Sequence, residues 1–359
     1  MKVAVGLSGG VDSSMAAILL KEQGHDVVGV TMRLWDGRYR GGSRDACFGP
    51  GEEHDIETAA ALAAEIGIEY RVFDCSAEYD AAIVRHFRET YLAGGTPNPC
   101  VRCNALMKFG LLPDLAARSG LQFDRFATGH YARIWRGDDG RLAVQRAIDD
   151  ARDQSYFLYR LSQEQLSRQI FPLGAIRKDE VRAKARALGI SVADKPDSQD
   201  FYSGDVAELI GTEDREGEIV DGSGRVLGHH HGFWHYTIGQ RKGLGIGGAG
   251  EPYYVLSLDA CRNRVIVGRA DETLTSEFAV TDIVFGALDE QAVRDAGEIN
   301  CAVKIRSTGA PKDGAVFTLT GDASGHCRFP AGLSGVAPGQ SAVFFGADGQ
   351  ILLGGIISR

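Results

Sequence analysis

The first half of the chain alternates short apolar runs with helical runs that end at glycine, and this alternation limits the fold more than any other feature. Residues 2–6 and 27–32 are near-continuous apolar runs, and between them a helical run from Asp12 to about Gln23 stops at Gly24. Buried strands that alternate with helices indicate a parallel sheet covered on both faces. Further helices are expected at 55–66, about 77–92 and 178–188, and further strands at 69–73 and 126–128.

The sequence changes character after about residue 204. Glycine becomes dense at 222–232 and 243–250, and long helical periodicity disappears. From Phe278 onward, short alternating runs separated by glycine turns predict a small sandwich or barrel. We therefore expect three domains: an α/β domain at 1–204, a small Gly-rich central domain at 205–275 and a C-terminal β-barrel-like domain at 276–359.

Composition excludes several classes of protein. The 359 residues are 44% hydrophobic, which excludes a disordered chain, and no apolar run reaches the roughly 18 residues needed to cross a bilayer. Seven scattered cysteines do not suggest a disulfide framework, so we expect a cytoplasmic protein with reduced thiols and no membrane partner. The net charge of −9 argues against coating nucleic acid by bulk charge. A polyanion must then be held by local patches, such as the stretch that contains Arg33, Arg38, Arg40 and Arg44.

The turn after the first strand has the composition of a phosphate-binding loop. Residues 7–14 read Leu-Ser-Gly-Gly-Val-Asp-Ser-Ser. Gly9 and Gly10 let backbone N–H groups approach a phosphate closely, and the following helix N-terminus adds its partial positive charge. Neither a Walker loop nor a dinucleotide-binding G-x-G-x-x-G is present. A glycine turn with an ordinary helix cap is the structural alternative. Three hydroxyl groups supply additional donors: Ser8, Ser13 and Ser14.

The full string S-G-G-V-D-S-S resembles the PP-loop of N-type ATP pyrophosphatases, which adenylate a substrate and release pyrophosphate. The resemblance implies an adenine nucleotide alpha hydrolase-like parallel sheet and places Asp12 beside the pyrophosphate and its Mg²⁺. A carboxylate beside a polyphosphate requires an intervening divalent cation.

Six further motifs occur in the order found in the tRNA 2-thiouridylase family, MnmA, and the resemblance extends over nearly the whole chain. It implies that ATP adenylates the 2-carbonyl oxygen of the wobble uridine in tRNA, that sulfur attacks that carbon, and that AMP leaves. The implied partners are the anticodon stem-loop of tRNA and a sulfur donor, either sulfide or a persulfide-carrying protein. The motifs are Thr96–Asn104, Lys108–Gly110, Ala127–Ala132, Asp153–Leu158, Lys195–Asp200 and Tyr236–Gly245.

The resemblance also assigns roles to residues. The implied ATP contacts are Gly6, Leu7, Ser8, Gly9, Gly10, Val11, Asp12, Ser13, Met32 and Gly129. The expected tRNA contacts are Asn98, His130, Asp153, Gln154, Ser155, Arg241, Lys242, Arg306 and Gln340. Two other classes of function compete. A PP-loop amide ligase would ignore tRNA, and a non-catalytic tRNA-binding protein would release no pyrophosphate.

The cysteines depart from the commonest family pattern. Cys103 matches the family's catalytic cysteine, but the second cysteine that most members carry after the Asp-Ser motif is absent from 197–204. Instead the chain has Cys100, which makes a C-x-x-C, and Cys47. The preferred hypothesis is a 4Fe–4S cluster on Cys47, Cys100 and Cys103, with the fourth iron open to sulfide.

Two other interpretations of these cysteines stay open. Cys100 and Cys103 form a redox dithiol in the first, with one of them carrying a persulfide and the C-x-x-C spacing favouring a low thiol pKa. The second is a zinc site, which normally needs a fourth ligand that the sequence does not supply.

Overall fold

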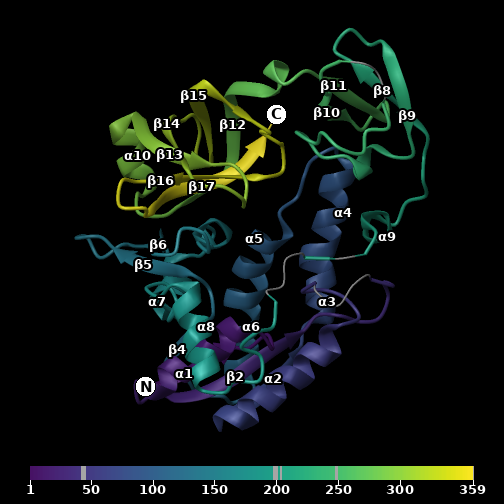
Figure 1. The fold of residues 1–359 in the computed structure, drawn as a ribbon. Coiled ribbons are helices and arrows are strands. Elements are labelled where there is room, and N and C mark those ends of the chain that lie inside the picture. Colours follow the sequence, from purple (N-terminus) through teal and green to yellow (C-terminus); the bar gives the residue numbers. More distant parts are fainter. Residues whose placement is uncertain (42–45, 197–200, 203, 247–249, 359) are drawn as a thin grey trace. The chain divides into compact units, whose positions relative to one another are not determined.

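The computed structural model describes residues 1–41, 46–196, 201–202, 204–246 and 250–358 (Figure 1). The chain divides into two compact units. Unit 1 consists of residues 1–83, 99–204 and 346–352. Unit 2 consists of residues 84–98, 205–345 and 353–359. Both units therefore combine segments that are far apart in the sequence.

Unit 1 is built on a parallel sheet of five strands in the order β3-β2-β1-β4-β7. The central strand is completely buried at Val3, Ala4 and Val5, which explains its unbroken apolar run. The chain order reverses on either side of β1, and ligands bind at such a point in open α/β sheets. The strands are β1 (Lys2–Gly6), β2 (Asp26–Arg33), β3 (Glu69–Asp74), β4 (Arg125–Thr128) and β7 (Gln169–Ile170).

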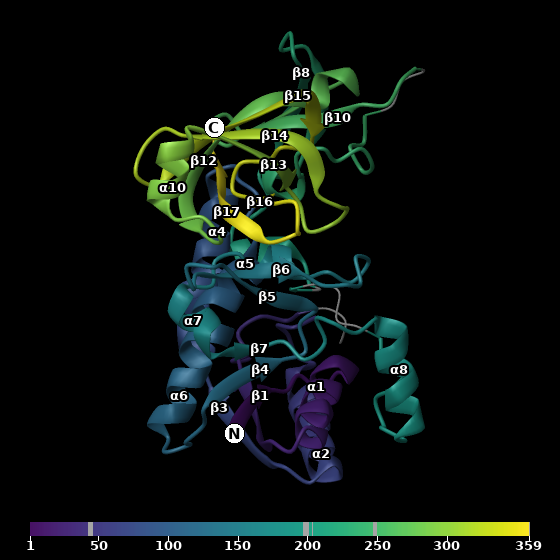
Figure 2. The same ribbon diagram turned by 90° about the vertical axis from the view of Figure 1, so that its left-hand side faces the viewer.

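Helices cover both faces of this sheet. Figure 2 shows α1 (Val11–Glu22) and α2 (Glu52–Ile66) on one side and α6 (Leu112–Arg118) on the other. Small residues of α1 and α2, among them Ala17 and Ala59, pack against the strands and bring the helices close to the sheet. α2 ends at Gly67, whose φ of 72° is a left-handed cap that suits glycine.

Two helical stretches contain π-helical turns: one passes from unit 1 into unit 2, and the other lies within unit 1. The helix expected at 77–92 consists of α3 (Ser76–Tyr79), the π segment Asp80–Val84 and α4 (Arg85–Leu92). A second stretch joins α5 (Pro99–Cys103), the π segment Asn104–Leu111 and α6 without a break. This second stretch was not predicted, although it contains the C-x-x-C. π turns occur frequently at functional sites.

The remaining elements of unit 1 surround the end of β4. They are β5 (Ala132–Arg136), β6 (Leu142–Arg146), the 3₁₀ turn Ser155–Leu158, α7 (Gln163–Arg168) and α8 (Lys178–Ala187). β5 and β6 form an antiparallel hairpin. α8 packs on α1 through Val181 and Ala185.

Unit 2 contains a four-stranded sheet in the order β10-β11-β8-β9 and a six-stranded closed barrel. The sheet region comprises α9 (Val206–Ile210), β8 (Gly217–Asp221), β9 (Val226–His230), the 3₁₀ turn Phe233–His235, β10 (Tyr254–Asp259) and β11 (Arg264–Gly268). Its core is lined by Phe233, Trp234 and Val265, and Tyr91 of α4 packs against that core.

The barrel closes in the order β12-β15-β14-β13-β16-β17 and leaves no free sheet edge. Alternate residues such as Phe317, Phe344 and Leu353 are buried in its interior. The elements are the 3₁₀ turn Asp271–Thr273, β12 (Leu274–Phe285), α10 (Glu290–Ala296), β13 (Glu298–Lys304), β14 (Lys312–Leu319), β15 (Ser324–Ser334), β16 (Ser341–Phe345) and β17 (Ile351–Ser358).

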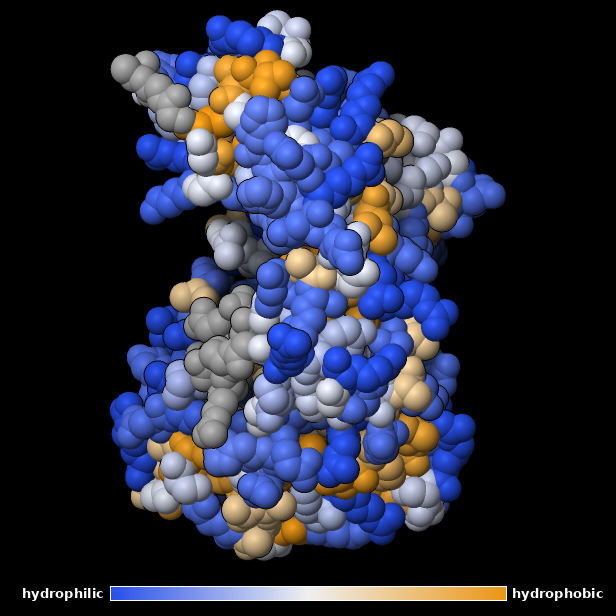
Figure 3. Space-filling model, turned by 90° about the vertical axis from the view of Figure 1, so that its right-hand side faces the viewer, coloured by the Kyte–Doolittle hydropathy of each residue, from blue (hydrophilic) through white to orange (hydrophobic). Residues whose placement is uncertain are grey.

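The expected fold class is confirmed: a parallel α/β part, a small central domain and a C-terminal barrel. The domain boundaries near 205 and 276 stay a prediction. Within the described part of the chain, every helix is too short or too polar to cross a bilayer. On the face shown in Figure 3, hydrophobic residues lie in separate patches on a mostly hydrophilic surface.

Candidate active site

A cavity of about 260 Å³ lies at the carboxyl ends of β1, β2 and β4 in unit 1. The ends of these strands contribute Gly6, Met32 and Thr128 to its wall. This is the place where an open parallel sheet binds ligands. Of the residues that the sequence proposed for ATP, tRNA or metal, ten line the cavity: Gly6, Leu7, Ser8, Asp12, Ser13, Met32, Cys47, Gly129, His130 and Gln154.

The glycine loop is a rigid turn that leads directly into α1. Gly9 has a φ of 67°, and a Cβ at this residue would lie 2.7 Å from the carbonyl oxygen of Asp55. The Ser13 hydroxyl accepts a hydrogen bond from the Ser8 N–H at 3.1 Å and donates to the Gly10 carbonyl at 3.1 Å. Gly10 itself has an extended backbone, with φ −104°, so the turn requires glycine at position 9 but not at position 10.

Gly129 brings the end of β4 against the start of α1. A Cβ at Gly129 would lie 2.6 Å from the backbone carbon of Asp12 and 2.6 Å from the backbone nitrogen of Ser13. Glycine is therefore required here by close backbone approach. The same contact fixes the position of the N-terminus of α1 relative to the end of β4.

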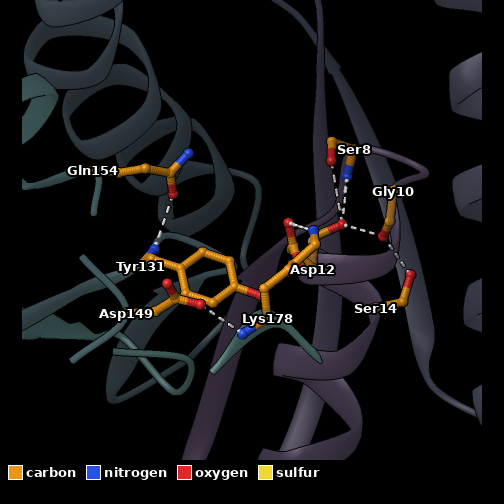
Figure 4. A network of polar contacts seen from close by, with 9 residues as sticks. Ser8, Gly10, Asp12, Ser14, Tyr131, Asp149, Gln154 and Lys178 are labelled. Atoms are coloured by element: carbon orange, nitrogen blue, oxygen red, sulfur yellow. Dashed lines mark hydrogen bonds and ion pairs between the residues drawn. The ribbon is translucent and has the colours of Figure 1, made fainter. Parts of the chain in front are cut away.

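Asp12 is held by a buried lysine that the sequence did not single out (Figure 4). Lys178 Nζ lies 2.8 Å and 2.7 Å from the two carboxylate oxygens of Asp12, and the lysine side chain is only 7% exposed. The Tyr131 hydroxyl donates a third hydrogen bond to Asp12, at 2.9 Å. The backbone N–H of Lys178 donates to Asp149, which fixes the first turn of α8. Asp12 thus has two neighbours that orient its carboxylate.

Two further lysines lie beside the loop. Lys195 Nζ pairs with Asp55 at 2.8 Å and donates to the Gly9 carbonyl at 3.2 Å. Lys108, from the π segment, lines the cavity directly. Lys108 and Lys195 each begin a motif named in the sequence analysis, Lys108–Gly110 and Lys195–Asp200. Membership of these motifs was the only sequence signal that pointed to the two lysines. Of the second motif, residues 197–200 lie outside the described residues.

Glu52 is a buried carboxylate in the cavity wall. It accepts hydrogen bonds from the backbone N–H groups of Leu34 and Trp35, at 2.8 Å and 2.7 Å, and so fixes the chain just after β2. Burial raises the pKa of Glu52 to about 7, although these two N–H groups act in the opposite direction. The sequence offered no signal for Glu52, because the helix was expected at 55–66 and begins three residues earlier, at Glu52.

His130 and Gln154 face the cavity, whereas the neighbours of Gln154 do not. Thr128 Oγ1 lies 2.7 Å from His130 Nδ1, and burial together with Lys108 lowers the pKa of His130 well below its usual value. The imidazole is therefore neutral at neutral pH. The Gln154 Oε1 accepts from the Tyr131 N–H.

Asp153 and Ser155 are buried side chains that bond to each other. The Asp153 carboxylate accepts from the Ser155 hydroxyl at 2.8 Å and from the Ala147 N–H at 3.0 Å. These contacts hold the turn that presents Gln154. Direct contact of Asp153 and Ser155 with tRNA stays a prediction.

The structure bears on the hypotheses of a metal site and of a redox dithiol at Cys47, Cys100 and Cys103. Among the described residues, no three His, Cys, Asp or Glu side chains are placed to hold a metal ion, so Cys47, Cys100 and Cys103 do not fit the expected cluster or a zinc site. They do lie in one neighbourhood, because charge on each of the three raises the pKa of buried Tyr79. The low thiol pKa expected from C-x-x-C is wrong for Cys103: burial raises its pKa to about 11.

The remaining candidates belong to unit 2. Arg241 and Lys242 are exposed on a loop that is anchored to β10 by the Gly239 N–H to Val255 carbonyl bond of 2.8 Å. Arg306 donates to the carbonyls of Ile238 and Gly335.

Gln340 donates to the carbonyls of Thr96 and Pro97, just before Asn98. It therefore holds the segment that leads to Asn98, an expected tRNA contact. Asn98, Arg306 and Gln340 stay predictions as tRNA contacts.

Two of the four arginines of the basic stretch at 33–44 are paired with carboxylates. Arg33 pairs with Glu53 at 3.3 Å, and Arg38 pairs with Asp36 and Asp80. Arg44 lies outside the described residues. This stretch therefore offers less positive charge than its sequence suggests.

Comparison with known proteins gives matches along the whole chain. Family models match in three parts: "tRNA methyl transferase HUP domain" at residues 1–202, "tRNA methyl transferase PRC-barrel domain" at 206–269 and "Aminomethyltransferase beta-barrel domain" at 275–357. Among solved structures, NMN synthetase from Francisella tularensis is similar at a TM-score of 0.33 and 17% identity, covering 54% of this chain and 64% of that chain. A likeness at that level carries no information on the reaction.

Curated relatives are much more similar. Proteins named tRNA-specific 2-thiouridylase MnmA are 42% identical in Endomicrobium trichonymphae, over 99% of both chains, and 45% identical in Rhodospirillum rubrum, over 99% of this chain and 96% of that one. The protein of that name from Methylobacterium radiotolerans is 43% identical over 100% of this chain and 94% of its own length. The chain therefore belongs to the tRNA-specific 2-thiouridylase MnmA family.

Proposed function

We propose that this chain replaces the 2-oxygen of the wobble uridine in tRNA with sulfur, at the expense of ATP. Two observations together support the proposal: the chain is similar to 2-thiouridylases over its full length, and an intact PP-loop lines the cavity at the strand ends. We propose that the reaction takes place in the cytoplasm, where both ATP and tRNA are found.

ATP is held by the loop in this proposal. Asp12 and Ser13 of the first turn of α1 line the strand-end cavity, so the N-terminus of this helix offers an anion site there. Adenylation makes the uridine oxygen a leaving group, because a uridine carbonyl is otherwise a poor electrophile. The phosphate chain must lie so that the α-phosphorus faces that oxygen, and Gly9 and Gly129 fix the loop and helix that position it.

The charges around the loop fit a divalent cation that arrives with ATP. Lys178 and Lys195 are paired with Asp12 and Asp55, so these two lysines leave little net positive charge for a triphosphate. Mg²⁺ is usually held by one or two carboxylates together with phosphate oxygens and water. Asp12 and Asp55 would hold it here. Bound in that way, Mg²⁺ would neutralise charge that develops on the departing pyrophosphate.

No step of the proposed reaction is routed through an iron–sulfur cluster, since no three His, Cys, Asp or Glu side chains of the described residues are placed to hold a metal ion. Sulfur must then come from a donor outside the chain: a persulfide passes its outer sulfur to a thiol of this protein, whereas sulfide attacks the activated carbon directly. Cys103 and Cys100 are the thiols that the sequence assigns to this step.

Recognition of tRNA is proposed to combine contacts from both units. His130 and Gln154 line the cavity, which supports their proposed contact with the target nucleotide, and neutral His130 can accept or donate one hydrogen bond. Arg241 and Lys242 offer charge to the phosphate backbone.

The test measures pyrophosphate release with and without tRNA, followed by nucleoside analysis of the tRNA. We expect release that depends on tRNA, and 2-thiouridine only when a sulfur donor is present. An amide ligase would release pyrophosphate without tRNA, and a binding protein would release none. The family models are named for methyl transfer, so a parallel reaction with a labelled sulfonium methyl donor is included. Methylated uridine without ATP consumption would refute thiolation.

A further inference from the structure

Cys47 differs from the other described cysteines of unit 1 in being both exposed to solvent and part of the cavity wall. Cys75 is buried, and Cys100 and Cys103 are half-buried and do not line the cavity. A thiol that takes sulfur from an external donor must be accessible from outside. One that delivers the sulfur to an activated nucleotide must reach the cavity. Cys47 meets both conditions.

The segment around Cys47 is anchored on both sides, which keeps the thiol at the wall. Its neighbours Ala46 and Phe48 are buried, with 6% and 2% of their surface exposed. The Phe48 N–H donates to the Phe201 carbonyl at 3.1 Å. Five aromatic rings surround the Phe48 ring with centroid distances of 5.0–6.2 Å: Trp35, Tyr39, Tyr79, Phe201 and Tyr202.

Cys47 also lies near a second thiol. Charge on Cys47 raises the pKa of Cys103, so the two sulfur atoms interact electrostatically. Cys103 is less exposed than Cys47 and does not line the cavity, so an external donor meets Cys47 first. The two residues are therefore suited to different steps.

We propose that Cys47 is the persulfide carrier that delivers sulfur to the adenylated uridine, and that Cys103 then resolves the covalent intermediate. This inference rests on the proposed function and names the residue that supplies its sulfur. It departs from the assignment of that role to Cys100 or Cys103.

The chemistry balances in three steps. The Cys47 thiolate attacks the outer sulfur of a donor persulfide; an S–S bond forms on Cys47, the donor S–S bond breaks, and the donor leaves as a thiol. The outer sulfur of Cys47 next attacks C2 of the adenylated uridine, and AMP leaves with the electron pair of the C–O bond. Cys103 then attacks the Cys47 sulfur, its proton passes to the departing group, and the thiouridine is released. The resulting Cys47–Cys103 disulfide is reduced by two electrons from a small dithiol.

The first experiment uses the wild-type protein. It is treated with cysteine persulfide whose outer sulfur is isotopically labelled, the remaining thiols are alkylated, and peptides are analysed by mass spectrometry. We expect the label on Cys47, and its transfer to tRNA when ATP and tRNA are added. Label on Cys100 or Cys103 with none on Cys47 would overturn the assignment. If wild-type protein makes no thiouridine from any sulfur donor, the proposed function itself fails.

Variants provide a second readout. Cys47→Ser should lose thiolation with the persulfide donor and regain it with excess inorganic sulfide, which can attack C2 directly. Cys261→Ser is the matched control, because Cys261 is an exposed cysteine of unit 2, and it should behave as wild type. Cys103→Ser should accumulate tRNA joined to Cys47 through a disulfide that a dithiol releases.

Three results contradict the carrier role. The first is full activity of Cys47→Ser with the persulfide donor, and the second is failure of sulfide to restore that variant. The third is stoichiometric iron in anaerobically purified wild-type protein that is lost in Cys47→Ser, since Cys47 would then be a cluster ligand.

Discussion

Gly9 and Gly129 are required by the backbone around the phosphate loop, whereas Gly10 is not, and alanine substitutions measure this difference as a loss of stability. At Gly129 the new Cβ would lie 2.6 Å from two backbone atoms of α1, so the backbone must shift. Overpacking of this kind costs about 1–3 kcal/mol. At Gly9 the left-handed backbone adds to a 2.7 Å contact with the Asp55 carbonyl, and the two effects together cost roughly 2–5 kcal/mol.

Gly10→Ala is the matched control within the same loop. Its Cβ would meet only the Ser8 hydroxyl, at 3.5 Å, and its backbone is extended. The assay is urea unfolding without ATP, followed by Trp35 and Trp135 fluorescence, since both tryptophans belong to unit 1. With a typical slope of about 2 kcal/mol per molar urea, Gly129→Ala should lower the midpoint by roughly 1 M, and Gly10→Ala should leave it in place. Equal midpoints for these two variants would refute the close-approach argument.

Three other perturbations test the site. Lys178→Met should destabilise unit 1 by about 3 kcal/mol, because it leaves the Asp12 carboxylate without its buried partner. The double variant Asp12→Asn, Lys178→Met should recover much of that stability but not pyrophosphate release. Stability changes that simply add in the double variant would contradict the pairing of these two residues. Arg241→Ala and Lys242→Ala should each weaken tRNA binding and lower its log–log salt slope by about 0.7–0.9, with ATP affinity unchanged; unaltered tRNA affinity in both would remove this loop from the interface. Burial raises the pKa of Glu52 from 4.5 to about 7, so between these pH values the unfolded chain loses a proton that the folded chain keeps. As the pH rises through this range, the free energy of unfolding therefore falls by up to about 3 kcal/mol. Glu52→Gln should remove that part of the pH dependence of unfolding, and an identical pH profile would show that Glu52 is not buried as described.

Local patterns were sufficient to predict the sheet of unit 1 and the phosphate loop. β1 and β2 are buried on both sides, so their apolar runs are continuous, and the loop lies in the turn that joins β1 to α1. The barrel was also expected, because alternation and glycine turns are local signals. Pairing order and closure depend on contacts between distant strands, such as Phe278 with Cys327, which no local pattern records.

The parts of the site that were missed depend on tertiary contacts. Lys178 begins an amphipathic helix whose sequence gives no sign that its ammonium group turns inward to Asp12, 166 positions away. The C-x-x-C spacing says nothing about burial, and burial is what raises the pKa of Cys103 instead of lowering it. The π segment Asn104–Leu111 likewise has no signature in composition, yet it brings Lys108 to the cavity.

The discontinuity of unit 2 has a consequence for synthesis on the ribosome. Helix α4 and residues 93–98 are made early, but their partners come last: Tyr91 packs on a core formed after residue 205, and Thr96 is bonded by Pro338 and Gln340. During elongation α4 meets its first partner in α9 only after residue 205, where the Leu209 carbonyl accepts a hydrogen bond from Arg88, and Thr96 meets Pro338 and Gln340 only when nearly the whole polypeptide has emerged. A messenger truncated after codon 204 would therefore encode unit 1 without its residues 346–352, together with an unsatisfied helix. We expect such a fragment to be captured by chaperones or degraded, and native protein to form only once the final strands have left the exit tunnel.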